Sequence, residues 1–319
     1  MKVYGTDIPD FTRRKKLMNK KIKKIFLMFS AAVILSAITT GCVKQNEKSE
    51  NPIGSEAADN PKIVATSMST VFIMEKLNLD LAGVPESAVD KLPSRYRNAK
   101  KIGMAMSPDM EKIKSLNPDW VFSPVSLVSD LQPKYENAGL KYGFLNLNNI
   151  PGMYKSIEDL GNLLNRKQEA NKLIKEYEDY IKDFKEKNKN IKKPKVLILM
   201  GLPGSYVVAT NQSYVGSLVE LAGGINVFKS DNQQFININT EEMLKKDPDI
   251  ILRTAHAMPD DVMKMFDDEF KKNDTWSHFR AVKDNKVFNL DYHKFGMSAK
   301  FNYPSALSDL EKIFYGGKN

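Results

Sequence analysis

Two loops of the sequence carry side chains that could serve as metal ligands. The first loop, Ile102–Asp109, contains Met106 in a stretch bounded by a glycine and a proline. The second loop, Ile251–Pro259, places His256 directly after an apolar run that is typical of a buried strand. A thioether and an imidazole can fill the two axial positions of a haem iron. The residue types alone also allow a purely structural interpretation. In that case Met106 fills a gap in the core, and His256 is a hydrogen-bonded histidine near a strand end.

These loops need a scaffold that brings them together, and the sequence predicts one. Short apolar strands at residues 62–66 and 81–84 flank a segment with helical periodicity, residues 71–79. A further apolar strand at residues 196–200 begins a second unit of the same kind. Such alternation predicts parallel α/β sheets. Ligands of these sheets bind beyond the carboxyl ends of strands, so the two loops could face each other across a cleft.

A long helix is predicted between the two units. From about Tyr154 to Lys189 the apolar residues recur near helical spacing, and no proline interrupts the pattern. Pro194 and the polar residues before it mark the end of the helix. The expected architecture is therefore two α/β lobes joined by one long amphipathic helix.

A helix-to-strand unit occurs twice, once in each predicted lobe. Residues 111–122 begin with Glu111 and reach a strand after Asn-Pro-Asp, and residues 241–252 begin with Glu241 and reach a strand after Asp-Pro-Asp. The proline keeps the residue before it out of helical geometry, which ends each helix. One glutamate at a helix start ordinarily complements the helix dipole. Two at matching positions suggest a role that the lobes share.

The N-terminal region is typical of an exported protein. Basic residues at 20–24 precede an uncharged apolar segment, residues 25–38, and small residues then lead to Cys42, the only cysteine. This order predicts a secretory signal peptide, because the apolar segment is too short to span the roughly 30 Å hydrocarbon core of a membrane. Cys42 resembles the acylated cysteine of bacterial lipoproteins, although Thr39 replaces the usual leucine. An ordinary buried cysteine is the alternative.

Charge and motifs exclude several classes of function. The formal net charge is +9, but nine lysines and arginines against two aspartates within residues 1–24 account for +7, which leaves about +2 after Cys42. Such a balance does not predict a nucleic-acid partner. The sequence has no Walker A loop, no dinucleotide-binding fingerprint, no Gly-x-Ser-x-Gly elbow and no His-Glu-x-x-His pair. Nothing in it argues for an enzyme.

The chain from about Lys62 to Tyr315 resembles the class III substrate-binding lipoproteins of ABC importers for siderophores, cobalamin and haem. It is most similar to the haem-binding lipoproteins of the iron-regulated surface determinant type. The matching stretches keep their order over nearly the whole folded region, and they are residues 92–96, 196–201, 203–206, 250–253 with His256 and Met258–Pro259, and 269–274.

The resemblance implies two α/β lobes joined by one rigid helix, with haem held in the cleft as a carried ligand. It aligns Met106 with the family's axial methionine and His256 with its axial histidine. Four further residues fall where the family contacts haem, namely Met68, Ser69, Ser87 and Ala88. Free amides at the helix start near Met68 would suit a carboxylate.

The resemblance also implies partners. In related lipoproteins one glutamate per lobe docks onto arginines of the permease, and Glu111 and Glu241 match that pair. Exposed ion pairs contribute only about 0–1 kcal/mol each, so these contacts would set orientation more than affinity. Arg95, Tyr96 and Arg97 are candidate neighbours of the haem propionates, with ordinary surface charge as the alternative.

These observations predict a lipid-anchored protein at the extracytoplasmic face of the cell membrane. It captures haem and delivers it to an ABC permease and its ATPase for iron acquisition, with upstream haem-donor surface proteins as further partners. A siderophore- or cobalamin-binding lipoprotein of the same fold and an extracytoplasmic haem-degrading or redox enzyme are the alternatives. The predicted parts are a signal peptide (1–41), a lipid anchor and flexible tether (42–61), an N-terminal lobe (62–153), a connecting helix (154–193) and a C-terminal lobe (194–319).

Overall fold

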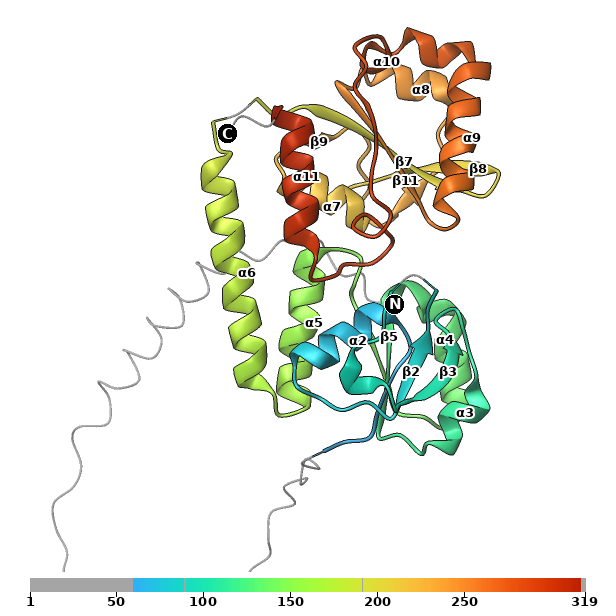
Figure 1. Ribbon diagram of the computed structural model, residues 1–319, viewed down its shortest axis with the longest axis vertical. Coiled ribbons are helices and arrows are strands. Elements are labelled where there is room, and N and C mark those ends of the chain that lie inside the picture. Colours follow the sequence, from blue (N-terminus) through green and yellow to red (C-terminus); the bar gives the residue numbers. More distant parts are fainter. Residues whose placement is uncertain (1–59, 89, 191, 317–319) are drawn as a thin grey trace, which may run out of the picture. The chain divides into compact units, whose positions relative to one another are not determined.

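The computed structural model describes residues 60–88, 90–190 and 192–316 (Figure 1). The predicted signal peptide, Cys42 and most of the predicted tether lie outside this part of the chain. Within it, no helix combines the length and the apolar character that a membrane span requires. The described residues form two sheets with their own helices, and a helical segment lies between them in the sequence.

The first sheet consists of residues from the predicted N-terminal lobe. Its strand order is β4-β3-β2-β1-β5-β6, and every neighbouring pair is parallel except β3 and β4. This topology confirms the parallel α/β prediction for this half of the chain. The strands are β1 (Ile63–Ala65), β2 (Gly83–Glu86), β3 (Lys100–Met104), β4 (Ser107–Pro108), β5 (Trp120–Pro124) and β6 (Tyr142–Leu145).

Three α-helices accompany this sheet, and the first begins three residues before the segment of apolar periodicity at residues 71–79. It starts at Met68 because Ser67 caps it, with the Ser67 hydroxyl accepting a hydrogen bond from the Thr70 N–H. It ends at Lys76, two residues before Asn78, which has a left-handed φ of 55°. The helices are α2 (Met68–Lys76), α3 (Met110–Ser115) and α4 (Val128–Asn137).

The second sheet is mixed rather than wholly parallel. Its strand order is β10-β8-β7-β11-β12, with β9 also paired to β7. Strands β7, β11 and β12 are parallel, as predicted, whereas β8 and β10 add antiparallel pairs at the edge opposite β12. The strands are β7 (Lys195–Leu202), β8 (Ser205–Ala209), β9 (Ile225–Asn226), β10 (Phe235–Ile236), β11 (Ile250–Ala255) and β12 (Val287–Asn289). The helices of this half are α7 (Tyr214–Leu221), α8 (Thr240–Lys245), α9 (Pro259–Lys272), α10 (Arg280–Lys283) and α11 (Tyr303–Tyr315).

The segment between the two sheets differs from the predicted single helix. It contains two helices, α5 (Ile150–Leu163) and α6 (Lys167–Lys187), which lie side by side (Figure 1). The break occurs at Asn165, whose φ of 55° is incompatible with a continuing helix. The prediction of one uninterrupted helix from Tyr154 to Lys189 is therefore wrong, although α6 is itself a long helix of 21 residues.

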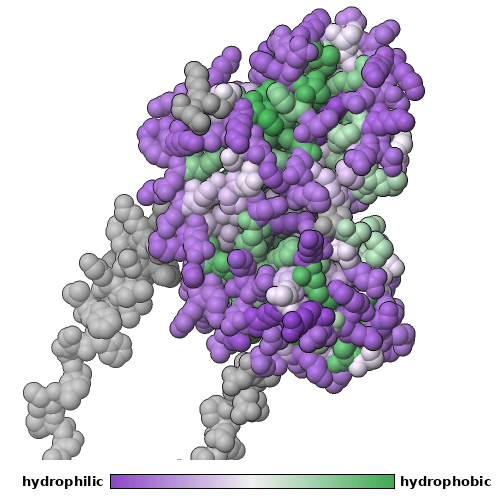
Figure 2. Space-filling view, in the orientation of Figure 1, coloured by the Kyte–Doolittle hydropathy of each residue, from purple (hydrophilic) through white to green (hydrophobic). Residues whose placement is uncertain are grey.

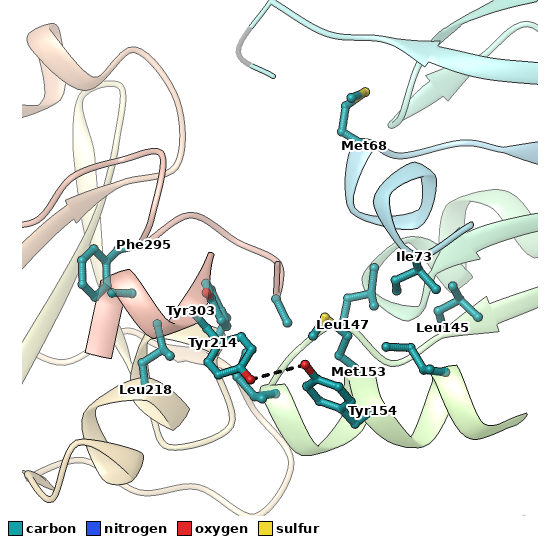
Figure 3. Packing of buried hydrophobic residues seen from close by; sticks show 14 of the residues in the cluster. Met68, Ile73, Leu145, Leu147, Met153, Tyr154, Tyr214, Leu218, Phe295 and Tyr303 are labelled. Carbon is teal, nitrogen blue, oxygen red and sulfur yellow. Dashed lines mark hydrogen bonds between the residues drawn. The ribbon is translucent and has the colours of Figure 1, made fainter. Parts of the chain in front are cut away.

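Tyrosine side chains join these two helices to the C-terminal helix. Tyr154 of α5 stacks on Tyr177 of α6 with ring centroids 4.2 Å apart. The hydroxyl groups of Tyr154 and Tyr303 of α11 lie 3.3 Å apart, as the dashed line in Figure 3 marks. Burial raises the pKa of Tyr154 to about 12, so its hydroxyl is neutral at physiological pH.

The surface drawn in Figure 2 is mostly hydrophilic, with smaller apolar patches.

Candidate functional site

The carboxyl edge of the first sheet brings together the predicted haem contacts of the N-terminal half. β1, β2 and β3 are parallel neighbours, so their carboxyl ends lie at the same edge. Met68 and Ser69 follow β1, Ser87 and Ala88 follow β2, and Met106 follows β3. Because neighbouring strands lie about 4.8 Å apart, these three segments are adjacent in space.

Met106 lies in the two-residue turn of a β-hairpin. β3 and β4 pair antiparallel, with Met104 opposite Ser107. Gly103 has a φ of 89°, and a Cβ there would lie 3.2 Å from the Ser107 carbonyl oxygen, so glycine is required at this position. The Met106 side chain is 65% exposed, which overturns the alternative of a core methionine. A reachable thioether is what an axial ligand requires.

The start of α2 presents two backbone amides that lack partners. Thr70 donates its N–H to the Ser67 hydroxyl, and Val71 donates to the Ser67 carbonyl oxygen. No hydrogen bond within the described residues uses the N–H groups of Met68 and Ser69. Both side chains are nearly buried, so a ligand here would meet mainly the backbone. Free N–H groups at a helix N-terminus favour a carboxylate.

The segment after β2 is tied to the C-terminal half of the chain. Ser87 and Ala88 are exposed, and the Ser87 hydroxyl accepts a hydrogen bond from the Asp90 N–H at 3.0 Å. The Asp90 carboxylate in turn pairs with the Lys300 ammonium at 2.8 Å. Both charged side chains are about four-fifths buried, which shields the pair from solvent. This ion pair restrains the backbone next to the predicted contacts.

His256 lies at the carboxyl edge of the second sheet, directly after β11. Its N–H donates to the Gly201 carbonyl oxygen of β7 at 2.9 Å, which fixes the backbone at this point. Its Nδ1 is buried and has no hydrogen-bond partner among the described residues, so a ligand would have to bind the ring through Nε2. The alternative of a hydrogen-bonded histidine at the strand end is therefore not supported by this geometry.

A buried arginine supports the strand that carries His256. Arg253 is 8% exposed and donates hydrogen bonds to Asp267 of α9 at 2.9 Å and to Asn289 of β12 at 2.7 Å. Its guanidinium also lies over the rings of Phe266 and Phe270. These contacts hold α9 and β12 against β11, so they stabilise the position of His256 indirectly.

The two predicted axial ligands belong to different sheets. Met106 stands at the carboxyl edge of the first and His256 at the carboxyl edge of the second. The structure thus builds the candidate site as two half-sites. No group of three or more His, Cys, Asp or Glu side chains within the described residues could hold a metal ion.

Two of the three candidate neighbours of the haem propionates already bind other groups of the protein. Tyr96 is buried and donates its hydroxyl to the Leu79 carbonyl oxygen at 2.7 Å, so the prediction for Tyr96 is wrong. Arg95 is bound to Asp80 at 2.8 Å and to Asn78. Arg97 is exposed. The sequence contains no signal for these contacts, because they depend on the loop between α2 and β2.

The two predicted docking glutamates occupy equivalent positions. Glu111 is the second residue of α3 after the N-cap Asp109, and Glu241 is the second residue of α8 after the N-cap Asn239. Both are exposed, and neither carboxylate has a hydrogen-bond or ion-pair partner among the described residues. They are therefore available to a partner.

The methionines divide into packed and exposed residues. Met243 is buried, and Met110, Met263 and Met265 pack partly buried against core clusters. Two exposed methionines were not among the predicted ligands, and they are Met104 and Met258. The sequence could have pointed to them, because Met104 lies two residues from Met106 and Met258 lies two residues from His256.

Comparisons with known proteins agree with this architecture. The family model for periplasmic binding proteins matches residues 63–293. The high-affinity heme uptake system protein IsdE of Staphylococcus aureus strain Newman is 40% identical over 300 residues, which are 92% of this chain and 99% of IsdE.

Solved structures give the same result. An ABC transporter substrate-binding protein from Listeria monocytogenes EGD-e matches with a TM-score of 0.77 and 48% identity, over 81% of this chain and 100% of that chain. S. aureus IsdE complexed with heme matches with a TM-score of 0.76 and 42% identity, over 80% of this chain and 99% of that chain. The predicted class III fold is confirmed, and the chain belongs to the periplasmic binding protein family.

Proposed function

We propose that this protein binds haem and delivers it unchanged to an ABC permease for iron acquisition. One observation carries the proposal: each sheet presents one reachable haem ligand at its carboxyl edge. Met106 is 65% exposed on its hairpin, and the half-buried His256 has a buried Nδ1, so it would bind iron through Nε2. Support also comes from IsdE, a 42% identical protein whose structure was solved with heme.

The residues of the chain would hold haem in complementary ways. The Met106 thioether and the His256 imidazole would fill the two axial positions, and haem iron accepts this pair in cytochromes c. The free amides of Met68 and Ser69 would receive a propionate carboxylate. With both axial positions filled, the iron has no open position for oxygen. This argues for transport rather than for haem degradation or redox catalysis.

A siderophore ligand is the alternative within the same fold. Anionic siderophores would need several convergent arginines, but three of the five described arginines are engaged in separate ion pairs. Arg95 pairs with Asp80, Arg253 with Asp267, and Arg280 with two aspartates, at separate places in the fold. This distribution favours haem.

Location and partners follow from the same proposal. Acylation of Cys42 would anchor the protein at the extracytoplasmic face of the cell membrane, with residues 42–61 as the tether. Glu111 and Glu241 would dock onto the permease, whose ATPase drives import. Haem-donor surface proteins would load the protein. We retain residues 62–153 and 194–319 as its two lobes.

Haem titration tests the ligand assignment. Haemin added to the purified apo-protein should shift the Soret band and give a six-coordinate spectrum. The double variant Met106→Ala/His256→Ala should lose six-coordination, whereas Leu163→Ala, which truncates an exposed apolar residue at the end of α5, should not. A double variant with the wild-type spectrum would refute the assignment. Competition with a ferric siderophore and with cobalamin tests the alternatives.

A further inference from the structure

Exposed methionines concentrate at the two half-sites. Five large apolar side chains are exposed among the described residues, and three of them are Met104, Met106 and Met258. Met104 is 66% exposed and Met106 is 65% exposed, on one and the same hairpin. Single exposed apolar residues need no explanation. Two exposed thioethers at one tight turn are a more specific arrangement.

The hairpin places these two thioethers within reach of the same point. Met104 is the last residue of β3, and Met106 follows after one turn residue. Their Cα atoms are therefore at most about 7 Å apart. A methionine side chain has three rotatable bonds, and neither of these side chains packs into a core cluster of the described residues. The sulfur of Met104 can thus move to a position near that of Met106 without unfolding any element.

We propose that Met104 is a reserve axial ligand for the haem iron, which binds when Met106 leaves. The inference rests on the proposed function. In this exchange one Fe–S coordinate bond breaks and another forms, and no proton or electron is transferred because both thioethers are neutral. The exchange would keep the iron six-coordinate while the hairpin changes conformation, for example during transfer to a partner.

Substitutions that remove sulfur but keep apolar volume test the proposal. Leucine is close to methionine in size, so M106L and M104L/M106L leave the exposed hairpin apolar. The readout is the near-infrared charge-transfer band that thioether ligation gives ferric haem, measured by absorption and magnetic circular dichroism. We expect M106L to keep the band and M104L/M106L to lose it, with the histidine-bound iron left five-coordinate.

A matched control uses the other exposed methionine. Met258 is 56% exposed but lies two residues from His256, on the other sheet. The variant M106L/M258L should therefore resemble M106L and keep the band. Circular dichroism of each variant checks that it is folded.

The outcomes separate this inference from the proposed function. A band in the wild-type protein that M106L alone abolishes overturns the reserve role and leaves the proposed function intact. A band that persists in M104L/M106L also overturns it, because the thioether then comes from elsewhere. A wild-type protein that binds no haem overturns the proposed function and this inference together.

Discussion

The two halves of the chain contain the same helix-to-strand unit with different side-chain support. In each unit a six-residue helix is followed, two residues after its end, by a residue with a φ of 46°, Asn117 in one half and Asp247 in the other. The aspartate after the proline then accepts the backbone N–H at the start of the central strand, at 2.7 Å in both halves. The backbone geometry of the repeated unit is thus the same.

The difference lies in a residue far along the chain. Arg280 pairs with Asp247 at 2.9 Å and with Asp249 at 2.7 Å, and so fastens the unit of the C-terminal half. Asp119, in the N-terminal half, forms no ion pair among the described residues. A local sequence motif therefore specifies a backbone, while distant residues decide how firmly it is held.

The two loops that carry the candidate axial ligands show the same contrast, because the loop of the C-terminal half is held more firmly than that of the N-terminal half. His256 has its backbone bonded to Gly201 and its ring partly buried, whereas Met106 is exposed at the tip of a hairpin. The C-terminal half would thus supply a fixed ligand and the N-terminal half a movable one. This contrast can be tested at four places.

The largest effect is expected from the ligands themselves. His256→Ala should weaken haem binding by roughly a hundredfold, about 2.8 kcal/mol, and Met106→Ala by roughly tenfold, about 1.4 kcal/mol. The imidazole has no substitute at its fixed position, whereas Met104 stands two residues from Met106. Competition with an apo-haem protein of known affinity measures both values. A larger loss for Met106→Ala would reverse the contrast between the halves.

The second largest effect is expected from the equivalent aspartates of the repeated unit, Asp119 and Asp249. Asp249→Ala removes bonds to the Lys195 N–H and to Arg280, so it should lower the free energy of unfolding by about 2 kcal/mol. Asp119→Ala removes one bond, to the Lys62 N–H in an exposed setting, and should cost about 1 kcal/mol. Urea unfolding measures both. Asp→Asn variants, which keep an acceptor oxygen, are the matched controls, and equal costs at the two sites would contradict the role of Arg280.

Several features of the site were predictable because they follow from local chemistry. A Pro-Asp sequence after a short helix ends the helix and begins a strand, which correctly placed α3, α8 and the strands β5 and β11. A histidine directly after an apolar strand must lie at the sheet edge, as His256 does. A methionine between a glycine and a proline must lie in a loop, as Met106 does.

Other features depend on tertiary contacts that no local pattern encodes. The helix break at Asn165 was missed because apolar spacing continues on both sides of it, where α5 and α6 face each other. Tyr96 was predicted as a neighbour of the haem propionates, but its ring is buried and its hydroxyl donates to the Leu79 carbonyl oxygen in the loop between α2 and β2. The exposure of Met104 could be known only once β3 was seen to end in a hairpin.

Lowering the pH should weaken the ion pairs that Arg280 forms in the C-terminal half, and the resulting loss of stability should be smaller than that of the aspartate variants. The Arg280 hydrogen bonds hold the pKa of Asp247 below its usual 3.8. Burial would raise the pKa of Asp249, but bonds from the Lys195 N–H and Arg280 outweigh it and lower that pKa as well. A carboxyl whose folded-state pKa is depressed stabilises the protein above its unfolded pKa, and this contribution is lost as pH falls through the folded value.

The variant Arg280→Gln tests this titration. Its melting temperature should lie below that of the wild type at pH 7, and the gap should narrow as the pH falls from about 4 through the lower folded-state pKa values of Asp247 and Asp249. Thermal unfolding followed by circular dichroism at several pH values measures the gap. A gap that stays constant down to pH 3 would show that Arg280 acts through packing rather than through its ion pairs.

The smallest effect is expected at the docking glutamates, and the two halves should differ here too. Glu241 is followed by the exposed Glu242, whereas Glu111 is followed by Lys112, which pairs with Asp109 at 3.2 Å. A neighbouring carboxylate can partly replace Glu241 against a permease arginine, but none stands beside Glu111 on its helix.

Glu111→Ala should therefore weaken docking more than Glu241→Ala, each by about 0–1 kcal/mol because the ion pairs are exposed. The measurement is binding of the haem-loaded protein to its permease in lipid nanodiscs at low and high salt, with unchanged Soret spectra as the control for haem binding. Glu241→Ala/Glu242→Ala should match the loss of Glu111→Ala, since it removes the substitute carboxylate as well. If the single variants are equal and the added Glu242 substitution changes nothing, the two docking helices are equivalent, and the asymmetry between the halves ends at the ligand loops.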